Sequence, residues 1–157
     1  MNHFLFWFTD TLAFWSIAFL FIPLSIFKKL IPFGFLGGFV YTLVIQLCAI
    51  HVFKIWTFKE DILMLWGIPV FFLLSWTAVT FTFGYLLLRF TKYQSLIVLG
   101  FATIAVLINY TAQTHQMITH RNWSLFQTFI YGIFSHIIIL YLLKFLYRKK
   151  NIGAMQP

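Results

Sequence analysis

Few side chains in this sequence could do chemistry, and the most informative of them is a histidine inside a long apolar run. His136 lies near the middle of residues 124–145, where the only charged residue is Lys144. Ionisable residues inside such runs are rare in membrane helices and commonly mark a functional site. A neutral imidazole there could bond a hydroxyl group across a helix interface, relay a proton or contact a ligand. The structural and the functional interpretation both stay open.

Amide side chains form the rest of the polar set. Gln46, Asn109 and Gln127 fall at a similar depth, in the outer third of the bilayer, when the apolar runs are treated as membrane helices. Gln113 shares a helix face with Asn109. These groups either hydrogen-bond between helices, worth about 0.6 kcal/mol per pair, or line a shallow cavity that opens outward. The candidate ligand-binding set is His136, Asn109, Gln113, Gln46 and Gln127.

Signatures of catalysis, cofactors and metals are missing from the sequence. It lacks the glycine-rich phosphate loop, the H-E-x-x-H zinc pattern and the G-x-S-x-G nucleophile elbow. Cys48 is the only cysteine, which excludes an intramolecular disulfide and a multi-cysteine zinc site. His115 and His120 could join His51 or Glu60 around a metal in the loops, but no spacing fixes that geometry. We expect no catalytic residue, no metal and no cofactor.

The elements that must position these residues are five long apolar runs. They cover residues 4–27, 30–52, 62–88, 95–113 and 124–145, and each can cross a hydrocarbon core of ~30 Å as a helix. Hydrophobic residues make up 62% of the chain and charged ones only 9%, whereas soluble domains average about a quarter charged. We predict an all-α, up-down bundle of five transmembrane helices. Residues 1–150 form the single domain, and residues 151–157 form a short, mobile cytoplasmic tail.

Basic residues at the ends of the runs predict the orientation. With the amino terminus outside, eight lysines and arginines lie on the cytoplasmic side and three on the outer side, as the positive-inside rule requires. The cytoplasmic set is Lys28, Lys29, Arg89, Lys92, Lys144, Arg148, Lys149 and Lys150, and the outer set is Lys54, Lys59 and Arg121. We predict a multi-pass protein of the bacterial cytoplasmic membrane with its carboxyl terminus inside. The net charge of +8 forms no basic face, so a nucleic-acid partner is not expected.

Small residues predict where helices pack against one another. Gly34 and Gly38 form a G-x-x-x-G pattern, which makes a shallow groove for a neighbouring helix. Packing within the chain is favoured there over dimerisation. Asp10, the only acid inside an apolar run, is interpreted as the cap of a helix that begins at Thr11, with a buried carboxylate as the alternative. The predicted helix-packing positions are Gly34, Gly38, Thr77, Thr80, Gly84 and Gly132.

Two resemblances to known families can be named. The aromatic-rich first run, the segment His51-Val-Phe-Lys-Ile-Trp56 and the stretch His120-Arg-Asn-Trp123 resemble small, uncharacterised polytopic membrane proteins of Bacillus-like Firmicutes. Trp66-Gly-Ile-Pro69 followed by Ser75-Trp76 is similar to carotenoid-biosynthesis and lycopene-cyclase-type membrane proteins. The second likeness implies a membrane enzyme with embedded acids, which the last four runs of this chain lack.

The function expected first is non-enzymatic: an accessory or structural subunit that packs against lipid or another membrane protein. Its contact sites would be the glycine groove and the outward polar pocket. The alternative is a membrane-embedded enzyme or carrier that acts on an apolar lipid or isoprenoid and holds its polar head with His136. The expected partners are the lipid bilayer and either another membrane protein or a second copy of the chain.

Overall fold

Helices account for most of this protein. The computed structural model describes residues 3–147, and 79% of the structure is helical. Within the described residues, five helices are long and apolar enough to cross a membrane. They are α1 (His3–Phe21), a continuous second helix (Leu24–Val52), α4 (Val70–Arg89), α5 (Gln94–Thr114, preceded by the 3₁₀ turn η3, Thr91–Tyr93) and α6 (Leu125–Tyr147). The second helix consists of α2 (Leu24–Phe33), the π-helical η1 (Gly34–Val40), α3 (Tyr41–Leu47) and the π-helical η2 (Cys48–Val52).

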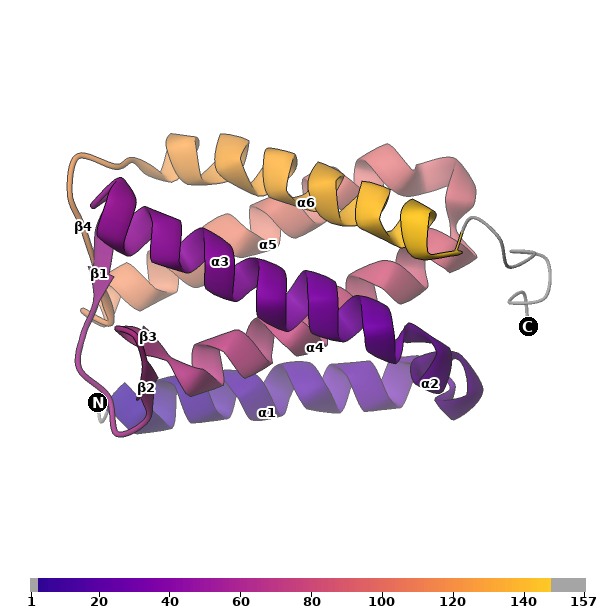
Figure 1. Ribbon diagram of the computed structural model, residues 1–157, viewed down its shortest axis with the longest axis horizontal. Coiled ribbons are helices and arrows are strands. Elements are labelled where there is room, and N and C mark those ends of the chain that lie inside the picture. The colour runs from indigo at the N-terminus through magenta and orange to yellow at the C-terminus, as the bar shows by residue number, and fades with distance from the viewer. Residues whose placement is uncertain (1–2, 148–157) are drawn as a thin grey trace.

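The third of the five long helices, α4, is the centre of the bundle. It packs against α1, α2, η1, α5 and α6, and most of its side chains are buried (Figure 1). The other four long helices bury a minority of their side chains and expose apolar ones. Along α6, for example, Phe126, Phe134 and Phe145 are 64–77% exposed. The outer surface of the bundle is therefore largely apolar.

The predicted break between the first and second helices is at the wrong residues. Helix α1 ends at Phe21, and the second helix begins at Leu24 with Pro23 before it. A proline disfavours helical backbone at the residue before it but fits the start of a helix, so the break falls here and not at residues 27–30. Lys28 and Pro32 therefore both lie within α2.

The third predicted helix starts too early, because a β-hairpin occupies its first residues. Strands β2 (Met64–Leu65) and β3 (Ile68–Pro69) pair antiparallel and precede α4. Trp66 and Gly67, in the turn, have φ of +50° and +86°, and this pair of positive values is typical of two-residue hairpins. Gly67 and Pro69 thus belong to a hairpin, whereas the sequence predicted a helix over residues 62–88.

Two connections that the sequence predicted as plain loops pair with each other. Strand β1 (Trp56–Phe58) and strand β4 (Ile118–His120) form an antiparallel ribbon in which Trp56 pairs with His120. The backbone bonds Lys59 N–H to Met117 O, 2.9 Å, and Arg121 N–H to Ile55 O, 2.7 Å, extend it. The β1–β4 ribbon covers the end of the bundle at which α1 begins, called the ribbon end below (Figure 1).

The glycine groove is filled by α4 of the same chain. A Cβ atom on Gly38 would lie 2.6 Å from the Cα atom of Thr77, and one on Gly34 would overlap the ring of Phe81. Gly84 faces Phe33 in the same way, and Gly132 lies against Ala102 of α5. The predicted packing glycines thus lie at contacts between helices, and the groove at Gly34 and Gly38 is not open to a partner protein.

Candidate functional site

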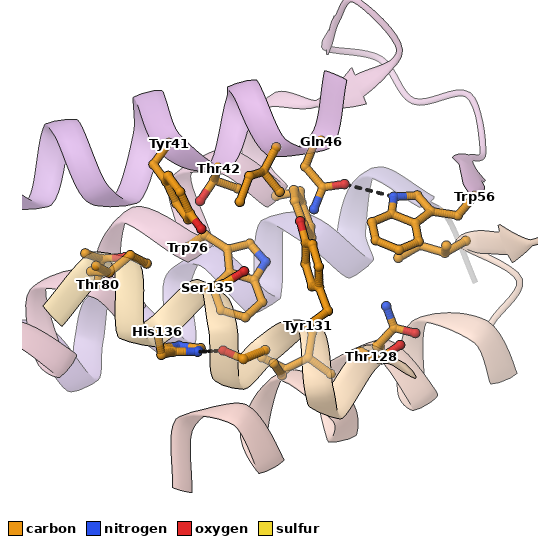
Figure 2. Close-up of a pocket in the computed structure, with 18 of the residues that line it drawn as sticks. Tyr41, Thr42, Gln46, Trp56, Trp76, Thr80, Thr128, Tyr131, Ser135 and His136 are labelled. Carbon is orange, nitrogen blue, oxygen red and sulfur yellow. Dashed lines mark hydrogen bonds between the residues drawn. The ribbon is translucent and has the colours of Figure 1, made fainter. Parts of the chain in front are cut away.

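A cavity lies between α3, α4, α5 and α6, just below the β1–β4 ribbon (Figure 2). Its volume is about 80 Å³, enough for a few water molecules or for the head of a larger molecule. Trp56 and Phe58 of β1 and Ile118 of β4 close it at the ribbon end. Helices α3 and α6 are not packed closely against each other beside it, whereas α5 and α6 are. The cavity is partly open, and the weak contact of α3 with α6 indicates that it meets the surface of the bundle between these two helices.

Two tyrosines at this opening have buried hydroxyl groups that lack a partner. Tyr41 of α3 and Tyr131 of α6 line the cavity from opposite sides. Among the described residues, neither hydroxyl has a hydrogen-bond partner, although both oxygen atoms are inaccessible to solvent. Ser135 lies close to both phenols, without the geometry of a hydrogen bond. Buried hydroxyl groups in proteins are usually paired, so these two are the least satisfied polar groups of the site.

His136 lies on the wall of the same cavity and is held by its own helix. Its side chain is 4% exposed, and its Nδ1–H donates to the carbonyl oxygen of Gly132 at 2.7 Å. Because Nδ1 carries the proton, Nε2 of the neutral ring is a hydrogen-bond acceptor. The rings of Trp76, Phe83 and Phe101 surround it, with centroids 5.0–6.4 Å away. This arrangement fixes the ring orientation and leaves one nitrogen available to a neighbour.

Trp56 is the central residue of the group that closes the cavity at the ribbon end, called the roof from here on. Its indole N–H donates to Oε1 of Gln46 at 2.8 Å, and both side chains are buried. The indole ring stacks on His120 with centroids 5.7 Å apart and meets Trp123 and Tyr131 edge-on. One side chain therefore links the ribbon to α3 and α6.

A chain of polar contacts supports the ribbon from α5. Nε2 of Gln113 donates to Oδ1 of Asn109 at 2.8 Å and lies 3.0 Å from Nδ1 of His120. The same His120 nitrogen lies 3.2 Å from the carbonyl oxygen of Trp123. One tautomer of His120 can accept from Gln113, and the other can donate to Trp123. Asn109 lines the cavity, while Gln113 acts one layer away as a support for His120.

The ribbon is expected to weaken in mild acid. Burial lowers the pKa of His120 from its usual 6.5, opposed by the hydrogen bond to the Trp123 carbonyl. The unfolded chain therefore takes up this proton first as the pH falls. The contribution to stability is complete above pH 6.5 and is lost as the pH falls through the lower folded-state pKa. Melting temperatures of the purified protein between pH 8 and pH 5 should show this decline. His120→Gln should reduce the slope of melting temperature against pH, and an unchanged slope in this variant would contradict the assignment.

Gln127, predicted as a pocket residue, caps a helix instead. Its Oε1 accepts from the backbone N–H of Ser124 at 2.7 Å, and Oγ of Ser124 accepts from the backbone N–H of Gln127 at 3.2 Å. This reciprocal pair is a capping box at the start of α6. The side chain of Gln127 is exposed and does not line the cavity.

Loss of this cap should cost stability alone. We expect Gln127→Ala to lower the free energy of unfolding by about 1 kcal/mol, as removal of a capping side chain commonly does. Ligand binding should stay within twofold of the wild type, because Gln127 lies outside the cavity. Chemical unfolding in detergent, paired with a binding assay, would check both values. A large loss of ligand binding at unchanged stability would show that Gln127 belongs to the binding site after all.

The remaining candidate residues lie apart from one another. Asp10 lies inside α1, which already begins at His3, so the predicted start at Thr11 and the capping role are wrong. Nε2 of His51 contacts the carbonyl oxygen of Trp66 at 3.1 Å, and His115 packs on Phe6. Within residues 3–147, no three histidine, cysteine or acidic side chains come together as a metal site.

Comparisons with known proteins do not identify a relative of this chain. No family model matches the chain, and no curated protein or solved structure is similar to it. The two resemblances drawn from sequence segments therefore stay predictions. The site has to be interpreted from its own residues.

The residues that define the opening were not predicted from the sequence. Of the candidate set, His136, Asn109 and Gln46 line the cavity. Tyr41, Tyr131 and Ser135 were missed, as was Trp56 as part of the roof. A signal for the first three was present: phenol and hydroxyl groups near the middle of apolar runs need a partner.

Proposed function

We propose that this chain is a multi-pass protein of the cell membrane that binds the polar end of an apolar molecule taken from the bilayer. The five long helices and the apolar outer surface support a membrane location, because an exposed apolar surface of this extent is unfavourable in water. Binding without chemical conversion is proposed, since none of the described side chains that line the cavity is an aspartate, glutamate, lysine or cysteine.

The observation that carries the proposal is the pair of unsatisfied tyrosine hydroxyls at the cavity opening. Burying a hydroxyl without a partner costs free energy. The hydroxyls of Tyr41 and Tyr131 could recover that energy if a ligand supplied the missing hydrogen bonds. Aromatic and aliphatic side chains form the rest of the wall, as is typical of small-molecule sites.

Retention of a small molecule tests the proposal. The protein, extracted gently from its own membrane, should carry a lipid-sized molecule in native mass spectrometry. Ser135→Phe should abolish retention, because a bulky ring would fill the opening between α3 and α6. Ile130→Phe, at an exposed position of the same helix that does not line the cavity, is the matched control and should retain the molecule. Equal retention in both variants, or none in the wild type, would contradict the proposal.

The expected accessory role is tested by the same spectrum. A second protein present in a fixed ratio would support a subunit of a larger assembly. The filled groove at Gly34 and Gly38 leaves that role without the contact surface first expected for it.

The proposed orientation places the ribbon end outside the cell. The ends of the bundle differ in charge: Lys28, Lys29, Arg89, Lys92 and Lys144 lie opposite the ribbon, while Glu60 and Asp61 lie at the ribbon end. In a Cys48→Ser background, we expect Lys59→Cys to react with a membrane-impermeant thiol reagent in intact cells. Lys92→Cys should react only after permeabilisation. The reverse labelling pattern would invert the orientation.

A further inference from the structure

We infer that the cavity selects a neutral lipid that carries a free hydroxyl group, and that it rejects the phosphate ester of the same lipid. The inference rests on the proposed function and names the chemical class of its ligand. It follows from the charge, the hydrogen-bonding groups and the size of the cavity.

Charge excludes an anionic head. None of the described side chains that line the cavity is a lysine, arginine, aspartate or glutamate. The basic residues nearest in sequence to the roof, Lys54, Lys59 and Arg121, are placed in the connections at the ribbon end. A phosphate bound in the cavity would be a buried charge without a counter-ion, which is strongly unfavourable. A neutral head avoids this cost.

Hydrogen-bonding capacity favours an alcohol over a carbonyl compound. The phenols of Tyr41 and Tyr131 can each donate one hydrogen bond. Among the described residues neither makes one, although Ser135 lies close to both. Nε2 of His136, on the same wall, can only accept while Nδ1–H is bound to Gly132. A hydroxyl group both accepts and donates, so it matches both kinds of partner. An ester or ketone oxygen only accepts and leaves His136 without a donor.

Size and shape place the rest of the ligand outside the cavity. A volume of about 80 Å³ holds a head group and the first few carbon atoms, but no complete lipid chain. Val44 of α3 and Ile138 of α6, on the two helices beside the opening, are 53% and 52% exposed. A hydrocarbon tail can follow this apolar border into the bilayer while the hydroxyl group stays at the tyrosines.

The test compares lipids that differ only in the head. Purified wild-type protein in non-ionic detergent is titrated with dioleoylglycerol, with the phosphatidic acid of the same chains and with trioleoylglycerol, and bound fractions are measured by native mass spectrometry. Dioleoylglycerol should bind at least tenfold more tightly than the other two. Farnesol, tested in the same way, shows whether an isoprenoid alcohol serves as well as a glycerolipid. Equal binding of the phosphatidic acid would overturn the inference and leave the proposed function intact.

Variants separate recognition from folding. Tyr41→Phe combined with Tyr131→Phe should weaken dioleoylglycerol binding roughly tenfold or more, because each lost hydrogen bond is commonly worth up to about tenfold in affinity. Removing unpaired hydroxyls should not lower the melting temperature. Tyr141→Phe, at an exposed tyrosine of α6, is the control and should bind as the wild type does. Unchanged affinity in the double variant would overturn the inference, whereas failure of every lipid to bind the wild type would overturn the proposed function itself.

Discussion

Replacement of Gly38 with alanine is expected to disrupt the bundle more than any other single methyl addition on the second helix. The new Cβ atom would lie 2.6 Å from the Cα atom of Thr77 and 3.2 Å from the Cβ atom of Thr80. The first of these atoms is backbone, so no side-chain rotation relieves the overlap and the helices η1 and α4 must move apart. We expect a loss of about 3 kcal/mol in the free energy of unfolding, at the upper end for overpacked cores. Unfolding in a denaturing detergent titration would measure it.

Gly100 supplies the matched control for Gly38. It lies on the exposed side of α5, and a Cβ atom there would meet nothing within 4 Å. Gly100→Ala should be neutral or should stabilise the protein by up to about 1 kcal/mol, because alanine restricts the unfolded chain and favours helix. If the two variants unfolded at the same denaturant concentration, the close contact of η1 with α4 would be refuted.

The second large effect is expected at Trp56. Truncation to alanine removes a side chain that is 4% exposed and leaves Oε1 of Gln46 buried without its donor. Large aromatic-to-alanine changes in cores cost about 3–5 kcal/mol, and the unpaired amide adds to this. We expect Trp56→Ala to lower the melting temperature strongly and to abolish ligand retention, because the roof of the cavity is lost. Thermal unfolding and native mass spectrometry of one preparation would record both.

A second tryptophan at the same end of the protein tests whether burial is the cause. Trp66 is 64% exposed and has a φ of +50°, which is unfavourable for a bulky residue. Trp66→Asn should leave stability unchanged or raise it, since asparagine accepts this backbone conformation in two-residue hairpin turns. Equal losses of stability in Trp56→Ala and Trp66→Asn would contradict burial as the cause of the effect at Trp56.

The number of helices could be predicted from the sequence because it depends on the length and apolarity of the runs alone. The boundaries depend on local chemistry that the apolar pattern hides. Pro23 ends the first run six residues before Lys29, although the chain around it stays apolar. The hairpin at Trp66 and Gly67 was not predicted from the sequence, because tryptophan is not a usual residue at positive φ. The pairing of Trp56 with His120 joins two loops with no common sequence signal.

The candidate site was predictable in part for the same reason. Depth along a helix follows from counting residues, so Gln46, Asn109 and Gln127 could be placed near one level, with His136 deeper in the membrane. Whether a side chain faces a cavity depends on the rotation of its helix and on its neighbours. Gln127 is near that level but is held by Ser124 at the start of its own helix. Tyr131 has no such local partner, and only the arrangement of α3, α4, α5 and α6 around the cavity makes it part of a site.

The pairing of β1 with β4 also has a consequence for synthesis of the chain. Trp56 leaves the ribosome more than sixty residues before His120, an interval of several seconds at about 5–20 residues per second. During that interval α4 and α5 are made while Gln46 and Trp56 still lack their neighbours in the second loop. The cavity can close only after α6 has followed. The nascent protein therefore passes through a stage in which this end is open, and quality-control proteases would meet it there first.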